Sequence, residues 1–332
     1  MKIAVVSDAW HPQPNGVVRV LSTLERELTA AGHRVGVLGP DHFHTMPCPT
    51  YPEIPLALFP AKRTAAWLKE FAPDAIHIAT EGPLGWAARA WCSKHGRRFT
   101  TAYHTKFPQY VSARSRLPLA VPVALMRRFH GPSAGVLVPT PAVLAELEDW
   151  RFANLRQWSH GVDTAVFRPR GKVVFDYLPR PVFLYVGRVT IDKNLPAFLD
   201  LDLPGSKVVV GSGPSRDALM RRYPEAHFII ARGDEQLAGY YSGADAFVFP
   251  SRTDTFGLVM LESLACGVPV AAFPVTGPLD VIGGSAAGVL SEDLRAAALA
   301  ALDIPPEPCL AHSARFSWAT VAEQFVANLA ID

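Results

Sequence analysis

The chain has 332 residues and carries 32 basic and 30 acidic side chains, for a formal net charge of +2. Its length exceeds one ordinary hydrophobic core and fits two domains of roughly 150 residues each. Although 49% of the residues are apolar, their runs are short and broken by proline or charge, which excludes a membrane-spanning helix. The four cysteines are scattered without C-x-x-C spacing, which excludes a disulfide framework and predicts a cytoplasmic protein.

Ten short apolar runs predict strands separated by helical stretches. They are residues 3–6, 34–38, 75–78, 99–102 and 135–138, then 182–186, 207–210, 227–230, 246–249 and 269–272. Such alternation is typical of parallel sheets with helices on both faces. It predicts an α/β protein with two Rossmann-like, doubly wound domains that bind ligands at the carboxyl ends of their strands. The prolines and glycines after residue 160 indicate domains 1–165 and 166–314, with a C-terminal helix in 315–332 that packs back on the first domain.

The loops after the predicted strands of the first half carry candidate ligand contacts. Asn15 and Gly16 follow the first strand. An Asn–Gly pair allows a positive φ and a close approach of the backbone to a ligand, but it is also typical of a plain turn. Glu81 follows the third strand and is a further candidate ligand contact. His104 follows the fourth strand, where a ligand contact and an ordinary hydrogen-bonded histidine both remain open.

Residues 82–145 contain nine basic side chains and no acidic one. Such a segment fits a basic face for anionic lipid or phosphate, and it equally fits scattered solvated charges. Apolar residues 117–126 run directly into Arg127 and Arg128, which indicates either a membrane-surface contact or a buried helix with a basic end. The candidates for a contact with a ligand or a membrane in this segment are Lys106, Tyr110, Arg114, Arg116, Arg127 and Arg128.

Two loops of the second half are rich in glycine or cations. Gly187, Arg188 and Lys193 follow the strand at 182–186, where the guanidinium and the ammonium could neutralise a diphosphate. A surface turn with ordinary charges is the alternative. Gly211 and Gly213 follow the next strand and form half of a dinucleotide fingerprint. Because the third glycine is absent, this loop is a weak indication of NAD binding.

The most informative segment is residues 250–262, between two predicted buried strands. It places Asp254 and Glu262 on either side of Gly257, which opens an apolar helix. Free N–H groups and the positive end of the helix dipole make such a helix start an anion site. The residues expected to line it are Thr255, Phe256, Gly257 and Leu258.

In this order and spacing, these motifs resemble the large family of retaining glycosyltransferases with the GT-B fold that includes glycolipid mannosyl-, glucosyl- and sulfoquinovosyltransferases. The resemblance spans nearly the whole chain. It also includes Gly161, Val162 and Asp163, with Phe167, Arg168 and Pro169. The family signature has two glutamates separated by seven residues, and here the first is the shorter Asp254.

The resemblance implies an N-terminal acceptor domain and a C-terminal nucleotide-sugar domain that face a cleft. Arg188 and Lys193 would hold the donor diphosphate, Glu262 the ribose and Asp254 the donor sugar. His104 would contact the sugar from the opposite domain, and Glu81 and the candidates of the basic segment would be acceptor contacts. The family donor site would also include the glycine loops, here Asn15, Gly16, Gly187, Gly211 and Gly213. Because no second carboxylate is an evident nucleophile, same-face substitution is favoured over a two-step route.

The expected activity is transfer of a hexose from GDP-mannose or a UDP-hexose to a lipid or glycolipid such as diacylglycerol. Neither a cofactor nor a metal is expected, since cations and the helix dipole can take up the leaving charge. The enzyme would work in the cytoplasm, peripherally on the inner face of the plasma membrane, without a nucleic-acid partner. A soluble or polysaccharide acceptor, a sugar-nucleotide epimerase and a nucleotide-binding regulatory module remain open. An NAD dehydrogenase is disfavoured.

Overall fold

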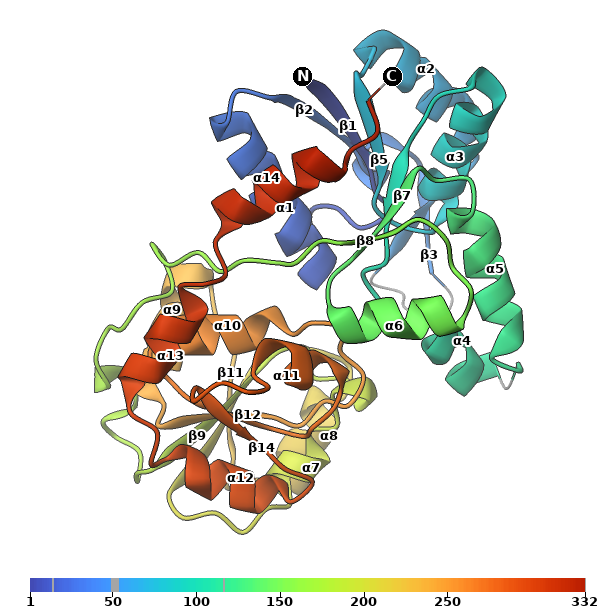
Figure 1. Ribbon diagram of the computed structural model, residues 1–332. Coiled ribbons are helices and arrows are strands. Elements are labelled where there is room, and N and C mark those ends of the chain that lie inside the picture. The colour runs from blue at the N-terminus through green and yellow to red at the C-terminus, as the bar shows by residue number, and fades with distance from the viewer. Residues whose placement is uncertain (14, 49–53, 116, 332) are drawn as a thin grey trace. The chain divides into compact units, whose positions relative to one another are not determined.

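The computed structural model describes residues 1–13, 15–48, 54–115 and 117–331, and it divides into two compact units (Figure 1). The first unit consists of Met1–His160 and Trp318–Asp332, and the second is Gly161–Ser317. The chain therefore passes between the units after His160 and after Ser317, within a few residues of the expected boundaries.

The first unit is built on a six-stranded parallel sheet with the order β2-β1-β5-β6-β7-β8. Its strands are β1 (Lys2–Val6), β2 (Arg34–Leu38), β5 (Ala75–Ile78), β6 (Thr100–Ala102), β7 (Gly135–Val138) and β8 (Leu155–Gln157). A separate antiparallel pair is formed by β3 (Thr45–Pro47) and β4 (Pro55–Ala57). The helices are α1 (Gly16–Ala30), η1 (Pro40–His42), α2 (Ala61–Phe71), α3 (Pro83–His95), α4 (Phe107–Ser115), α5 (Ala120–His130), α6 (Pro141–Asp149) and α14 (Trp318–Asn328).

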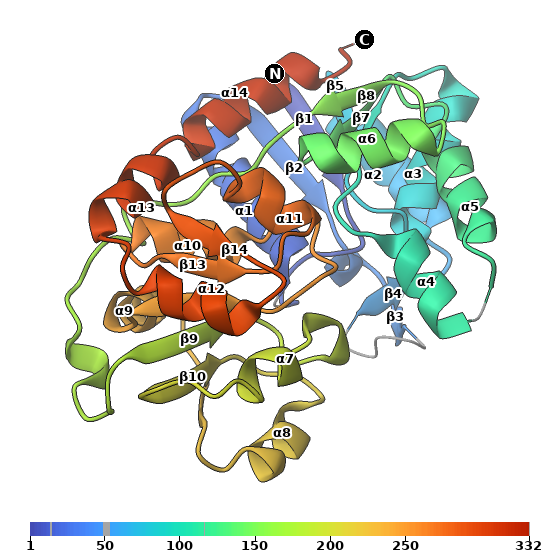
Figure 2. The same ribbon diagram turned by 60° about the horizontal axis from the view of Figure 1, so that its bottom comes forward.

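The central strands β5, β6 and β7 are buried along their whole length because helices cover both faces. Ala4 and Val6 of β1 pack with Ile76 and Ile78 of β5 in one core cluster. The C-terminal helix α14 lies beside α1 in both views (Figures 1 and 2). The indole N–H of Trp158 donates to the carbonyl of Val321 at 3.1 Å, which fixes α14 to the segment after β8.

The second unit repeats this plan, with the strand order β11-β10-β9-β12-β13-β14 and every neighbouring pair parallel. The strands are β9 (Val182–Val186), β10 (Ser206–Val210), β11 (His227–Ile229), β12 (Ala246–Phe249), β13 (Val270–Ala272) and β14 (Gly288–Leu290). The helices are η2 (Val173–Phe175), η3 (Ile191–Lys193), α7 (Pro196–Leu199), α8 (Arg216–Arg222), α9 (Asp234–Gly243), α10 (Leu258–Ala265), α11 (Thr276–Val281), α12 (Leu294–Ala301) and α13 (Pro306–Ser313).

Strand β9 shows how the pleat builds two cores in this unit. Val182, Leu184 and Val186 point into a cluster with α9 and α10, whereas Phe183 and Tyr185 point into a cluster with α7 and α12. Successive side chains of a strand face opposite sides of the sheet, and both sides are covered, so the whole strand is apolar. Each unit is thus the doubly wound α/β sheet that the sequence predicts, with its loops gathered at the carboxyl ends of the strands.

Candidate functional site

The predicted donor residues of the second unit lie in three loops at the carboxyl edge of its sheet. Gly187, Arg188 and Lys193 follow β9, the pair Gly211 and Gly213 follows β10, and residues 250–257 follow β12. Strands β10, β9 and β12 are adjacent and parallel, so these loops share one edge. This is the edge at which open α/β sheets bind their ligands.

The loops after β9 and β12 are tied together by polar contacts. Lys193 Nζ forms an ion pair with Asp254 Oδ1. The amide of Asn194 donates to the carbonyl of Pro250 at 3.1 Å, and the Thr253 hydroxyl lies 3.4 Å from the carbonyl of Asp192. Burial by itself raises the pKa of Asp254, but the charge and hydrogen bond of Lys193, with the nearby Arg188, lower it overall. Asp254 is therefore ionised at neutral pH, and the Lys193 ammonium is held beside it.

Gly211 and Gly213 allow the loop after β10 to pack against the loop after β9. A Cβ atom on Gly211 would lie 1.9 Å from the carbonyl oxygen of Gly187, and one on Gly213 would lie 2.4 Å from that of Val189. The N–H of Val189 donates to the carbonyl of Ser212 at 2.8 Å, which completes this contact. The two glycines thus support the loop that carries Arg188 and Lys193.

Helix α10 begins at Gly257 as the sequence predicts. Gly257 is the N-cap with φ +88, a conformation that a residue with a side chain rarely adopts. Phe256 is buried, while Thr255 and Leu258 are partly exposed. The first N–H groups of α10, next to Asp254, have the orientation and partial positive charge that bind an anion.

Glu262 lies one turn into α10 and is buried in the core. Only 3% of its surface is exposed, and its Oε2 accepts a hydrogen bond of 2.9 Å from the hydroxyl of Tyr241. Tyr241 of α9 therefore holds the Glu262 carboxylate in one orientation. The predicted contact of Glu262 with a ribose remains a prediction.

The structure contradicts the expected backbone at Asn15 and Gly16. Gly16 is the first residue of α1 and does not have a positive φ. Asn15 is instead the N-cap of α1 in extended conformation, and its side chain accepts a hydrogen bond from the N–H of Val18 at 3.0 Å. An Asn–Gly pair can form a turn or start a helix, and the amphipathic run that follows decides for the helix here. Apart from its chain neighbours and the backbone of its own helix, no described atom lies within 4 Å of where a Cβ of Gly16 would be.

His104 lies just after β6 in a cluster of aromatic rings within the first unit. Its ring centroid is 5.9 Å from Trp158 and 6.1 Å from His160. Burial, with the neighbouring His160 and His77, holds the pKa of His104 well below its usual value. His104 is therefore neutral at physiological pH and can offer a hydrogen bond but no charge.

Glu81 is held in place by a buried histidine that the sequence analysis did not select. Glu81 Oε1 lies 3.3 Å from His130 Nε2, and His130 Nδ1 lies 2.9 Å from the hydroxyl of Thr101. His130 is only 1% exposed, whereas the Glu81 side chain is 13% exposed. His130 lies at the end of α5, 49 residues after Glu81. The local sequence around either residue therefore does not predict their pairing.

Asp8 was also missed, although it directly follows the first strand. Its Oδ1 accepts from the N–H of Leu84 at 2.8 Å, and its Oδ2 accepts from the hydroxyl of Thr80 at 2.9 Å. Burial raises the pKa of Asp8 to about 6 despite these hydrogen bonds. Asp8 thus caps the start of α3 from a neighbouring strand. The sequence offers one indication of such a role, namely that Asp8 is a polar residue just after a buried strand.

Two described cations of the acid-free segment, Arg89 and Lys106, are engaged in contacts within the first unit. Arg89 donates to the carbonyls of Phe129 and Arg128 at the end of α5. Lys106 forms a 3.0 Å ion pair with Glu146. Arg116 lies outside the described residues, as do the side chains of Tyr110 and Arg114.

Arg127 and Arg128 remain exposed on α5, beside a group of exposed apolar side chains. We call these residues the α4–α5 surface; they are Leu117, Leu119, Val121, Leu125, Arg127 and Arg128. Helices α4 and α5 lie side by side in Figure 2. Within the described ranges, no helix combines the length and the hydropathy that a bilayer crossing requires.

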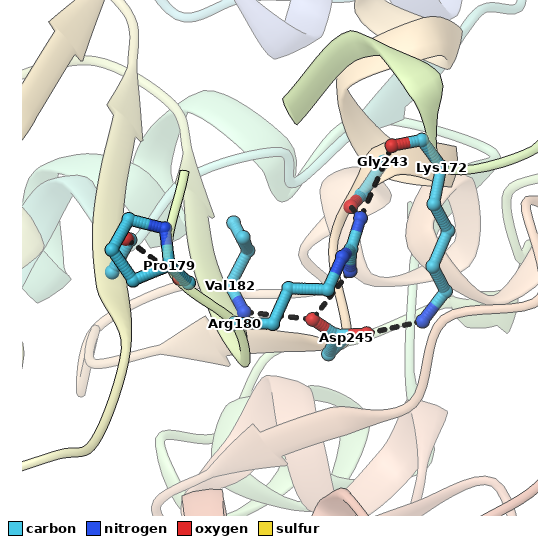
Figure 3. A network of polar contacts seen from close by, with 7 residues as sticks. Lys172, Pro179, Arg180, Val182, Gly243 and Asp245 are labelled. Carbon is cyan, nitrogen blue, oxygen red and sulfur yellow. Dashed lines mark hydrogen bonds and ion pairs between the residues drawn. The ribbon is translucent and has the colours of Figure 1, made fainter. Parts of the chain in front are cut away.

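A second cluster of opposite charges lies at the amino edge of the second sheet (Figure 3). Asp245, just before β12, accepts from Lys172 Nζ, from Arg180 at 2.6 Å and from the N–H of Val182 at 2.7 Å. Arg180 also donates to the carbonyls of Lys172 and Gly243, each at 3.1 Å. This cluster borders a cavity of about 730 Å³. None of the predicted donor residues lines that cavity.

Solved structures place this fold in a known class. A sucrose-phosphate synthase from Thermosynechococcus elongatus aligns with a TM-score of 0.78 at 21% identity, covering 98% of this chain and 97% of that chain. Two Rossmann-like units, with a candidate anion site at the carboxyl edge of the second, define a protein of the GT-B fold.

The family follows from the sequence comparisons. The family model described as Glycosyltransferase Family 4 matches residues 14–166, and the one described as Glycosyl transferases group 1 matches residues 180–304. A GDP-mannose-dependent alpha-mannosyltransferase from Mycobacterium tuberculosis is 28% identical over 87% of this chain and 83% of its own length. An alpha-monoglucosyldiacylglycerol synthase from Streptococcus pneumoniae is 27% identical over 82% of this chain and 71% of its own length. The chain belongs to the group 1 glycosyltransferases and is a glycosyltransferase that uses a nucleotide sugar.

Proposed function

We propose that this enzyme transfers a hexose from GDP-mannose or a UDP-hexose to a lipid or glycolipid acceptor, with retention of configuration and without a metal. The observation that carries the donor assignment is the carboxyl edge of the second sheet. There Lys193 and Arg188 lie beside the start of α10. A diphosphate needs such a combination of fixed cations and free N–H groups.

The same groups support a mechanism without a metal or a protein nucleophile. As the bond between sugar and diphosphate breaks, negative charge develops on the leaving phosphate. Lys193, Arg188 and the positive end of α10 are preorganised to stabilise that charge. The leaving phosphate is then free to accept the proton of the attacking hydroxyl on the same face of the sugar. We assign Asp254 to the donor sugar because its Oδ1 is occupied by Lys193, which leaves Oδ2 for a hydroxyl.

A lipid acceptor is supported by the α4–α5 surface. Exposed leucines next to two exposed arginines match a membrane with an apolar interior and anionic headgroups. The relative from Streptococcus pneumoniae is named as the synthase of a glucosylated diacylglycerol, which supports a lipid acceptor here. We therefore place the enzyme peripherally on the cytoplasmic face of the membrane.

A transfer assay with four reactions tests this function. GDP-mannose and UDP-glucose are each offered with diacylglycerol-containing anionic vesicles or with a soluble mannose oligosaccharide, all in the presence of EDTA. We expect an α-linked glycolipid from one donor only, identified by NMR of the product. Transfer only to the oligosaccharide would contradict the lipid acceptor, and an inverted product would contradict retention. Loss of activity in EDTA that added Mg²⁺ restores would contradict metal independence.

Charge reversal of Arg127 and Arg128 tests the membrane contact separately. The double change to glutamate should weaken binding to vesicles rich in phosphatidylserine by about tenfold or more, since each cation near such a surface contributes about 1 kcal/mol. Arg221 and Arg222 of α8 are the matched control, because they are also adjacent, exposed and at the end of a helix. Equal effects of the two double variants in a sedimentation assay would contradict a specific α4–α5 surface.

A further inference from the structure

Asp192 is a largely buried acid in the loop after β9 whose carboxylate accepts no hydrogen bond from the described residues. It lies in η3 between Arg188 and Lys193, and its side chain is 10% exposed. Among the residues that the structure describes, neither Oδ1 nor Oδ2 has a hydrogen-bond partner. A carboxylate withdrawn from water without donors costs free energy, so natural proteins keep such groups where a ligand or bound water supplies the donors.

The neighbouring arginine does not supply them. Arg188 is 3.7 Å from Asp192 Oδ2, which is within reach of charge attraction but beyond a hydrogen bond. The position of Asp192 is nevertheless fixed, because Thr253 lies 3.4 Å from its carbonyl and the next residue, Lys193, is paired with Asp254. Asp192 is therefore an acceptor that the fold holds ready rather than a mobile surface acid.

The chemistry of the donor determines which part of it Asp192 can meet. Phosphate oxygens only accept hydrogen bonds and carry negative charge, so a carboxylate repels them. Hydroxyl groups donate, and a hexose presents several. Thr190, two residues earlier, has a buried hydroxyl that also lacks a partner among the described residues. The loop after β9 thus offers cations for the phosphates and free acceptors for hydroxyls.

We propose that Asp192 binds the transferred sugar by accepting a hydrogen bond from one of its hydroxyl groups. This inference rests on the proposed donor site and goes beyond it by dividing the β9 loop between two parts of the substrate. Arg188 and Lys193 bind the diphosphate, and Asp192 contributes to the choice of sugar. The affinity for a nucleoside diphosphate without a sugar should consequently not depend on Asp192.

The test compares each nucleotide with and without its sugar. Binding of GDP, GDP-mannose, UDP and UDP-glucose to wild type and to Asp192→Asn is measured by calorimetry. A hydrogen bond to a charged group typically contributes enough that its loss weakens binding about tenfold to a hundredfold. We expect such a loss for the nucleotide sugar and no loss, or tighter binding, for the nucleoside diphosphate. Asp217→Asn, an exposed acid of α8, is the control and should leave both affinities unchanged.

A donor analogue provides the second arm. Deoxy-sugar nucleotides that each lack one hydroxyl are bound to both proteins. Removing one particular hydroxyl should weaken binding to wild type but not to Asp192→Asn, since both changes remove the same hydrogen bond.

Thermal unfolding of each protein is measured beside the titrations. Asp192→Asn should unfold at the same or a higher temperature because it removes a buried charge without hydrogen bonds.

The failures of the two proposals are distinguishable. Weaker binding of the nucleoside diphosphate by Asp192→Asn would show that Asp192 acts through Arg188, the ribose or the base, and would overturn its assignment to the sugar. Unchanged binding of both ligands would also overturn it while leaving the donor site intact. If wild type binds no nucleotide sugar at all, the proposed function fails, and this inference fails with it.

Discussion

The second unit contains two clusters with the same residue types and opposite patterns of hydrogen bonding. At the amino edge of the sheet, Lys172, Arg180 and the N–H of Val182 together satisfy both oxygens of Asp245 (Figure 3). At the carboxyl edge, Lys193 occupies one oxygen of Asp254, whereas neither oxygen of Asp192 accepts a hydrogen bond from the described residues. The two clusters share their residue types and differ in unused hydrogen-bonding capacity, and this difference is our reason for proposing the carboxyl edge as the donor site.

The volume of a cavity does not point to the same place as the unused hydrogen-bonding capacity. The 730 Å³ cavity lies at the amino edge, where Asp245 already has all its donors. There the charges hold the segment before β9 against the start of β12. A large cavity beside satisfied charges fits a gap between packed elements. We propose the carboxyl edge as the donor site although that cavity lies at the other edge.

The largest expected difference between the clusters is in turnover. Lys193→Ala should lower the rate of sugar transfer by about 10²–10³-fold, because it removes a preorganised charge from the leaving phosphate. Lys172→Ala is the matched control, since its ammonium is also paired with an aspartate. We expect it to keep wild-type turnover in a steady-state assay. Similar rate losses in both variants would remove the distinction between the two clusters.

The next effect is on stability, and here the amino-edge cluster should be the more sensitive of the two. Asp245→Asn should lower the free energy of unfolding by about 2 kcal/mol, because it leaves donors of a partly buried network unsatisfied. Asp192→Asn should cost nothing. Urea unfolding followed by circular dichroism measures both. If Asp192→Asn were destabilised and Asp245→Asn were not, the assignment of the stabilising network to Asp245 would be wrong.

The smallest effect is the pH dependence of the Asp245 contribution. Burial raises the pKa of Asp245, but Lys172, the N–H of Val182 and Arg180 outweigh it and hold the pKa below its usual value. A carboxyl with a lowered folded-state pKa stabilises the protein above its unfolded pKa of about 3.9 and loses that contribution as the pH falls. The difference in unfolding free energy between wild type and Asp245→Asn should be full at neutral pH and shrink below about pH 4. A constant difference across this range would contradict the ion-pair origin of the effect.

The sequence predicted most of the fold because the strands of both sheets are buried on two faces. Runs such as 182–186 and 246–249 are apolar throughout and have no competing interpretation. Strands β8 and β14 were not predicted, because they are three residues long and only partly buried. In β8 the polar Arg156 is structural and donates to the carbonyl of Asn328 at 2.7 Å. A short edge strand with such a residue lacks the periodic signal that longer strands provide.

The candidate site was predictable where a glycine or a cation marks a loop after a strand. Gly257 and Lys193 were found in this way. The pairing of Glu81 with His130 and the capping of α3 by Asp8 were not, since each joins residues that only the folded sheet brings together. Asp192 was passed over although it lies between Arg188 and Lys193, because an acid beside two cations resembles an ordinary solvated charge. Asp192 is distinctive because its side chain is 10% exposed and accepts no hydrogen bond from the described residues.

The central claim is that the carboxyl edge of the second sheet binds the nucleotide-sugar donor, and calorimetry of donor binding tests it most directly. GDP-mannose and UDP-glucose are titrated into wild type, Lys193→Ala and Lys172→Ala. We predict that one donor binds wild type and Lys172→Ala with equal affinity, and that Lys193→Ala loses this binding. Equal donor affinity in all three proteins, or a loss confined to Lys172→Ala, would contradict the account.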